Sequence, residues 1–116
     1  MDLYASNISS GNNQTIWTYV SNFTTQQWVL VGAIIDWSNT NAYLNSLSWA
    51  GNPIWNGSAS AVATISFLDR EIPVIANTAM SHEFRMVFDR SFGNLKHLHL
   101  IFRSASDGET LCTVSK

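Results

Sequence analysis

Two histidines separated by one residue, His97 and His99, form the pattern in this 116-residue chain that best suits metal chemistry. Alternate residues of a β-strand project to the same face, so these imidazoles would lie about 7 Å apart along one strand. If this strand forms a hairpin with the strand before it, Glu83 and Arg85 lie across from the pair. Two imidazoles and one carboxylate can bind zinc with an open position. Because Arg85 beside a metal ion is unfavourable, we interpret the histidines as polar residues on a solvated strand face.

Candidates for acid–base or nucleophilic catalysis are few. Asp69 and Glu71 flank Arg70, and a cation between two carboxylates indicates a solvated edge rather than a general acid and base. Ser, His and Asp all occur, but the sequence contains no Gly-x-Ser-x-Gly nucleophile elbow. It also lacks a Gly-rich phosphate loop. We therefore predict that the protein is not an enzyme and needs no cofactor.

Aromatic residues offer a different kind of site. Trp17, Tyr19 and Trp28 lie near Gln26 and Gln27, and an exposed aromatic ring matches the CH face of a pyranose sugar. Aromatic and amide side chains together are typical of lectins and carbohydrate-binding modules. The alternative is that these rings pack against a neighbouring subunit or cap the fold, since exposed aromatic patches usually mark interaction surfaces.

Two further features concern covalent chemistry. Cys112 is the only cysteine, so the chain cannot form an internal disulfide. The simplest role for Cys112 is that of a small buried hydrophobe, and the alternative is an intermolecular bridge or a reactive thiol. Asn-x-Ser/Thr sequons, which are possible acceptors of N-linked glycans, occur at Asn7, Asn13, Asn22 and Asn56.

The composition limits the class of protein. Charged residues make up 12% of the chain, against about 25% in a typical soluble protein. A hydrophobic fraction of 46% can form a core, which excludes bulk disorder. With a net charge of −2 and no basic stripe, we expect neither nucleic acid nor an anionic membrane surface as a partner. No apolar run approaches the roughly 18 residues of a membrane-spanning helix.

The same composition suggests a compartment. The first residues have neither the basic region nor the apolar region of an intact signal peptide. Low Lys content and abundant Ser, Thr and Asn suit an exported surface that does not depend on charge for solubility. Either the protein stays inside the cell or this is a mature or trimmed form, and this composition favours the trimmed form of a secreted or cell-surface protein.

The spacing of apolar residues predicts an all-β fold. From Thr15 onward, short apolar runs recur roughly every 10 to 15 residues between turn-forming residues, without helical periodicity. We expect one antiparallel β-sandwich domain over 14–116, with about seven to nine strands. Residues 1–13 are polar and aperiodic, so we expect a flexible leader or linker, or alternatively a strand that pairs with a neighbouring edge. Strands are expected at 15–22, 27–37, 43–49, 54–56, 61–67, 70–75, 81–89, 95–103 and 111–114.

Several strands carry more specific predictions. The run 27–37 is apolar on both faces, so it must be central or cross between sheets, with a bulge near Gly32. Pro73 indicates an edge strand, and a turn is expected at 51–53. Alternation in the last two long strands predicts a hairpin that turns at 93–94. Its core side chains would be Phe84, Met86, Phe88, Leu98, Leu100 and Phe102. Core or sheet-end packing is expected for Trp37, Trp49 and Trp55.

A segment in the middle of the chain resembles a known family. Ile35-Asp36-Trp37 precedes a short polar loop and the pattern Leu44-x-x-Leu47-x-Trp49-x-Gly51-x-x-Ile54-Trp55-x-Gly57. This is similar to the immunoglobulin-like (Ig-like) β-sandwich domain of bacterial exported, pilin-associated surface proteins. Later similarities are Arg70-Glu71-Ile72-Pro73, Met80-x-x-x-Phe84-x-Met86-x-Phe88 and the strand, acidic-Gly turn and Cys from Leu98 to Cys112. The resemblance covers roughly 28–113. It implies an Ig-like fold, export and a structural role, and it supplies no catalytic residues.

Together these observations predict a non-enzymatic structural domain, a subunit of a pilus- or filament-like surface assembly. Few of the Lys residues that normally protect sheet edges are present, so we expect self-association through strand edges or aromatic patches. Other subunits of such an assembly are the alternative partners. The alternative function is a carbohydrate-binding or adhesin module that uses exposed Trp and Tyr.

Overall fold

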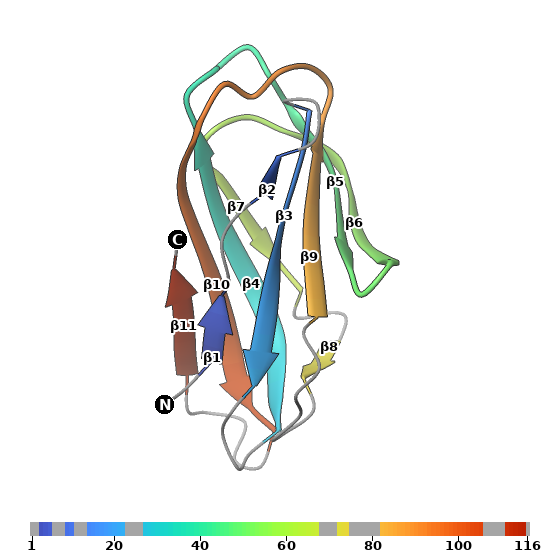
Figure 1. The fold of residues 1–116 in the computed structure, drawn as a ribbon, viewed down its shortest axis with the longest axis vertical. Coiled ribbons are helices and arrows are strands. Elements are labelled where there is room, and N and C mark those ends of the chain that lie inside the picture. The colour runs from blue at the N-terminus through green and yellow to red at the C-terminus, as the bar shows by residue number, and fades with distance from the viewer. Residues whose placement is uncertain are drawn as a thin grey trace.

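The protein is described here by a computed structural model of a β-sandwich (Figure 1). The described residues are 3–5, 9–10, 14–22, 27–67, 72–74, 82–105 and 111–115. They form eleven strands and no helix, which confirms the predicted all-β class. None of them therefore forms a helix long and apolar enough to span a membrane.

Every strand pairing is antiparallel, and the strands divide between two packed sheets. The first sheet has the order β1-β3-β9-β5-β6, with β2 also paired to β3. The second has the order β11-β10-β4-β7, with β8 also paired to β4. The first sheet contains β1 (Leu3–Ala5), β2 (Ser9–Ser10), β3 (Thr15–Asn22), β5 (Leu44–Trp49), β6 (Asn52–Ala59) and β9 (His82–Phe88). The second contains β4 (Trp28–Trp37), β7 (Ala63–Ser66), β8 (Ile72–Val74), β10 (Leu95–Ser104) and β11 (Leu111–Ser115).

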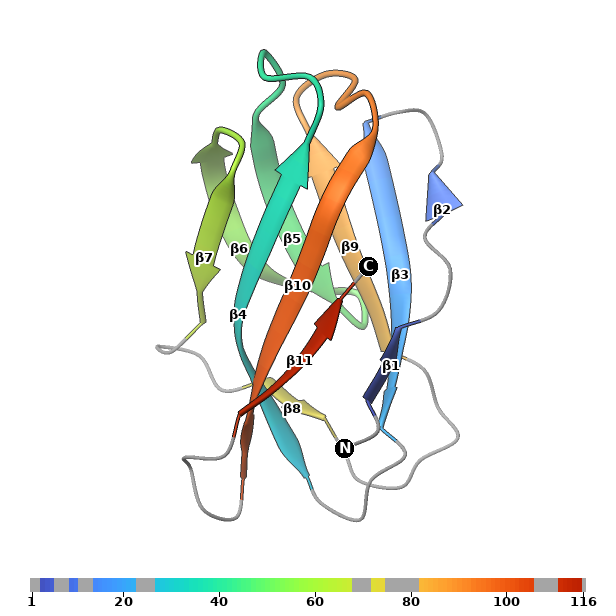
Figure 2. The ribbon, with the colours of Figure 1, turned by 90° about the vertical axis from the view of Figure 1, so that its left-hand side faces the viewer.

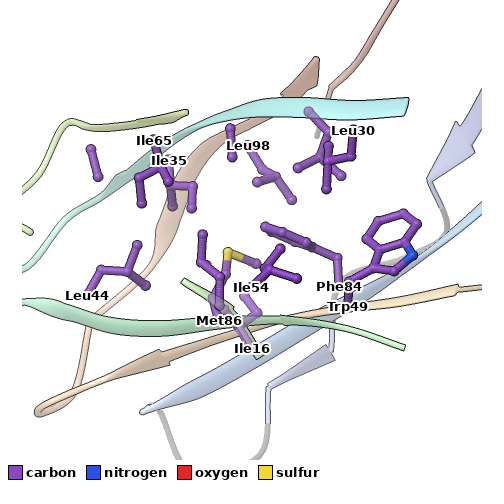
Figure 3. Close-up of a cluster of buried hydrophobic side chains, with 14 of the residues drawn as sticks. Ile16, Leu30, Ile35, Leu44, Trp49, Ile54, Ile65, Phe84, Met86 and Leu98 are labelled. Carbon is purple, nitrogen blue, oxygen red and sulfur yellow. The ribbon is translucent and has the colours of Figure 1, made fainter. Parts of the chain in front are cut away.

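The core lies between the sheets, as Figure 3 shows for side chains such as Leu30 and Met86. The six core residues predicted on β9 and β10 are all buried, which confirms the faces assigned from alternation. Trp37 and Trp49 are also buried as predicted, and Trp55 is half-buried against the core. Trp37 satisfies its indole by donating a 3.0 Å hydrogen bond from Nε1 to the carbonyl of Ala42.

The predicted hairpin of β9 and β10 is wrong, because the two strands belong to different sheets. β9 pairs with β3 and β5, whereas β10 pairs with β4 and β11. Residues 89–94 connect the sheets, which lie about 10 Å apart in a sandwich. Alternation shows which face of a strand is buried, but it does not show which strand is the pairing partner. Two strands in different sheets can bury their apolar faces against the same core from opposite sides.

β4 is central in the second sheet, as its apolar composition predicted. Its register with β10 shifts between the pairs Ile101–Gly32 and Phe102–Leu30, which leaves Val31 as the extra residue of a bulge. The predicted bulge near Gly32 is therefore confirmed. A bulge changes which side chains face the core, so Leu30 and Ala33 are both buried.

The N-terminal segment and the β5–β6 turn differ from expectation. β1 and β2 pair with β3 of the same chain, and with the nine expected strands they account for the eleven observed. The turn between β5 and β6 lies at Ala50-Gly51 rather than at 51–53. Both residues have positive φ, 52° and 84°, as a two-residue hairpin turn requires.

Candidate functional site

Charged residues in the described strands lie only on strands inside the sheets. Asp36 is on β4, Glu83 and Arg85 are on β9, and Lys96 and Arg103 are on β10. Each of these strands has a paired strand on both sides. Charge is thus concentrated where the backbone of the sheet is already hydrogen-bonded.

The described strands at the sheet edges carry no charged residue. Natural proteins usually protect such edges with Lys or other charges, because an unpaired edge is a template for another strand. Among the described residues, the strands at both edges of both sheets lack that protection. The edge sequences are LYA in β1, SS in β2, NPIWNGSA in β6, ATIS in β7, IPV in β8 and LCTVS in β11.

The uncharged edges correspond in part to a long charge-free run in the sequence, which the average composition does not show. No charged residue occurs from 37 to 68, between Asp36 and Asp69. This run includes β5, β6 and β7, and β6 and β7 lie on the same side of the sandwich (Figure 2). β6 and β7 on this side therefore both come from an uncharged segment, which a scan for charge-free runs would have found.

β6 is uncharged but irregular. Its register with β5 shifts twice, once near Leu47–Ser48 and once near Leu44–Ser46. Pro53 near its start has no N–H to offer a further strand. Bulges and prolines both interrupt edge pairing, so β6 has protections other than charge.

β7 is uncharged and regular. It pairs with β4 through four consecutive residues, from Gly32–Ser66 to Ile35–Ala63, without a register shift. Ala63 and Ile65 are buried, whereas Thr64 and Ser66 are exposed. Val62, directly before the strand, is 57% exposed, the most of the large hydrophobic side chains that the structure describes as exposed. No described strand pairs with the far side of β7.

The other edge positions differ from β7. β8 contains Pro73, opposite Val29 of β4, which confirms the predicted edge strand. β11 lies beside β1 of the first sheet (Figure 1), so this edge has a neighbour within its own chain. The register places Cys112 opposite Phe102, but the predicted burial of the Cys112 side chain lies outside the described residues.

The predicted aromatic platform is only partly assembled. In the β3–β9 register, Trp17 lies opposite Arg85 and Tyr19 lies opposite Glu83, on the outer face of the first sheet. The guanidinium carbon of Arg85 is 5.3 Å from the Trp17 ring centroid, within cation–π range. Arg85 Nε also donates a 2.8 Å hydrogen bond to Glu83 Oε1. Tyr19 is 39% exposed.

The structure corrects the third member of that platform. Trp28 is only 2% exposed and belongs to the core. It lies on β4 in the second sheet, so it shares no surface with Trp17 and Tyr19. The cause is that β4 is buried on the face that carries Trp28, which an apolar run without alternation does not reveal.

The predicted metal ligands are not brought together. His97 and His99 are neighbours, with ring centroids 6.1 Å apart, on β10. Glu83 lies on β9 in the other sheet, because the expected hairpin does not form. The residue opposite His97 is Asp36 of β4. Within the described ranges no group of three or more His, Cys, Asp or Glu residues could hold a metal ion.

The predicted glycosylation sites differ in burial. Asn22 is fully buried on β3, so its side-chain amide is not exposed in the folded protein. Asn56 is exposed on β6. Asn7 and Asn13 lie outside the described residues, as do the acidic pair and arginine at 69–71.

Comparisons with protein-family models, with curated proteins and with solved structures each find no match for this chain.

Proposed function

We propose that this protein is a non-enzymatic structural domain whose copies associate through uncharged strand edges in an exported or cell-surface assembly. The observation that carries the proposal is the position of the charges. Interior strands carry Asp36, Glu83, Arg85, Lys96 and Arg103, whereas the described edge strands carry none. This distribution is the reverse of the one that keeps sheet edges apart.

An Ig-like arrangement is part of the same proposal. Its support is the strand order, because β1-β3-β9-β5 corresponds to the A-B-E-D sheet and β11-β10-β4 to the G-F-C sheet of such a sandwich. β6 would then be an addition to the first sheet beyond β5. β7 and β8 would be additions beside β4. The added strands β6 and β7 both come from the uncharged run 37–68.

Sedimentation velocity over a concentration series tests the assembly. We expect the average mass to rise with protein concentration up to about 1 mM, because association follows mass action. Raising NaCl from about 0.1 to 1 M should leave the association intact, since pairing of uncharged strands is not a screened charge interaction. A particle that stays monomeric over the whole series would contradict the proposal, and loss of association in salt would indicate an attraction between charges instead.

A carbohydrate-binding module is the second candidate function. The observation that favours it is exposed Tyr19 beside the Glu83–Arg85 pair, which offers hydrogen-bond donors and acceptors next to an aromatic ring. The Trp17 ring interacts with Arg85, so Tyr19 would be the principal stacking residue. Binding on a glycan array that is lost in Tyr19→Ala and kept in Tyr43→Ala, at another exposed tyrosine, would support this function. An array without signal would remove it.

A further inference from the structure

We propose that β7 is the strand through which two copies pair, antiparallel and about a two-fold axis, so that their second sheets join into one continuous sheet. This inference rests on the proposed function, and it names both the partner, a second copy of this chain, and the strand that binds it. Pairing of this kind is strand addition at a sheet edge, in which main-chain hydrogen bonds supply the attraction.

The first argument is the contrast among the available edges. β6 is interrupted by Pro53 and by two register shifts. β8 contains Pro73, and β11 already lies beside β1. β11 is as continuous in register, and as free of charge, Pro and Gly, as β7, so its neighbour β1 is what distinguishes it. β7 combines these properties with no described strand on its far side. Only a regular strand offers an uninterrupted ladder of outward N–H and C=O groups to a partner.

The second argument concerns the identity of the partner. In an antiparallel pair about a two-fold axis, each strand meets a copy of itself, and any charge would lie near the same charge. β7 and the residue before it, VATIS from 62 to 66, contain no charged residue, so self-pairing brings no like charges together. The same absence offers no electrostatic recognition to a charged partner of another kind. A second copy is therefore the occupant that this edge fits.

An antiparallel pair about this axis can be centred on Thr64 or on Ile65, and Thr64 is the exposed residue of the two. The arrangement centred on Thr64 places it opposite the partner's Thr64, with Ala63 opposite the partner's Ile65 and Val62 opposite the partner's Ser66. Cross-strand Thr–Thr pairs are favourable. Side chains of Ala63 and Ile65 remain on the core face. Val62, at 57% exposed, would then lie against the partner strand.

The interface should be weak. β7 contains four residues, which is short for an interface strand. A contact below the roughly 800 Å² per partner of a standard interface is typical of transient association. We expect a dissociation constant on the order of 0.1 mM.

A pair of lysine variants tests the strand. Thr64→Lys places two ammonium groups opposite each other across the axis, and we expect at least about tenfold weaker association by sedimentation. Ser58→Lys is the matched control, because Ser58 is exposed on the irregular edge strand β6. Its association should equal that of the unmodified protein. Far-ultraviolet circular dichroism of both variants verifies that the fold is kept.

The outcomes separate the two proposals. If the unmodified protein associates and Thr64→Lys associates equally well, the β7 inference is overturned while the proposed function stands. Loss of association in Ser58→Lys alone would move the contact to β6 and also overturn the inference. If the unmodified protein never associates, the proposed function itself fails.

A cross-linking measurement provides a second readout that keeps the strand uncharged. Directly opposed residues have Cβ atoms about 4.5–5.5 Å apart, close to the separation in a disulfide. Thr64→Cys should therefore form a disulfide-linked dimer under mild oxidation, whereas Ser58→Cys should not. The unmodified chain serves as the control for Cys112. Equal cross-linking of the two variants would overturn the inference.

Discussion

β6 and β7 follow each other in the chain, come from the same uncharged run and lie on the same side of the sandwich, yet they differ as edges. β6 has two register shifts and a proline, whereas β7 keeps one register over its whole length. The absence of charge does not by itself make an edge available. Regular backbone geometry is a second requirement, and of these two strands only β7 meets both.

The substitution expected to cost the most stability is in the core on which both sheets pack. Phe102 is fully buried in the core between the sheets. Phe102→Ala should lower the free energy of unfolding by about 3–5 kcal/mol. That loss approaches the whole stability of a small domain, which is about 5–15 kcal/mol. Urea unfolding followed by tryptophan fluorescence measures it, and a loss below about 1 kcal/mol would show that Phe102 is not a core residue.

A substitution beside β7 should cost less stability than Phe102→Ala and should distinguish the role of β7 from that of β6. Gly32 lies opposite Ser66, and a Cβ on Gly32 would approach the backbone oxygen of Ile65 to 3.3 Å. Gly32→Ala should therefore displace β7 and cost about 1–3 kcal/mol of stability. It should also weaken association, which sedimentation measures together with urea unfolding. Unchanged association with reduced stability would mean that the position of β7 does not matter for pairing.

The matching change on β6 should cost less. A Cβ on Gly57 would lie 2.8 Å from the half-buried Trp55 ring, which is the end of a side chain and can move. Gly57→Ala should lower the free energy of unfolding by about 1 kcal/mol and leave association unchanged. Ser58→Ala is the control without such a contact. If Gly57→Ala reduces association more than Gly32→Ala does, the comparison between the two edges is reversed.

The smallest effect on stability is expected from a glycan at Asn56. This residue is exposed on β6, and a bulky solvated modification there adds little to the core energetics. Expression in a host that performs N-glycosylation, compared with Asn56→Gln, should give equal melting temperatures and equal association if β7 is the contact. Association restored only by Asn56→Gln would place the contact on β6.

The faces of the strands were predictable, whereas their partners were not. Phe84 and Leu98 were both assigned to the core from alternation, and both are buried. Their strands nevertheless pair in different sheets, because alternation is a local property and pairing depends on residues distant in sequence. The predicted aromatic platform and the predicted zinc site are not assembled for the same reason. Trp28 and Glu83 each lie in a sheet different from that of their expected companions.

From the amino-acid sequence alone it was possible to predict the bounds of most strands, the core side chains of β9 and β10, the bulge beside Gly32 and the edge position of Pro73. These features depend on the spacing of apolar residues and on backbone chemistry within a few residues. Only the tertiary structure decided that β9 and β10 lie in opposite sheets, that the N-terminal segment pairs with β3, and that β7 is a regular edge. These features depend on residues that are distant in the sequence. The free energy of each strand pairing depends on how all the strands pack together on one core.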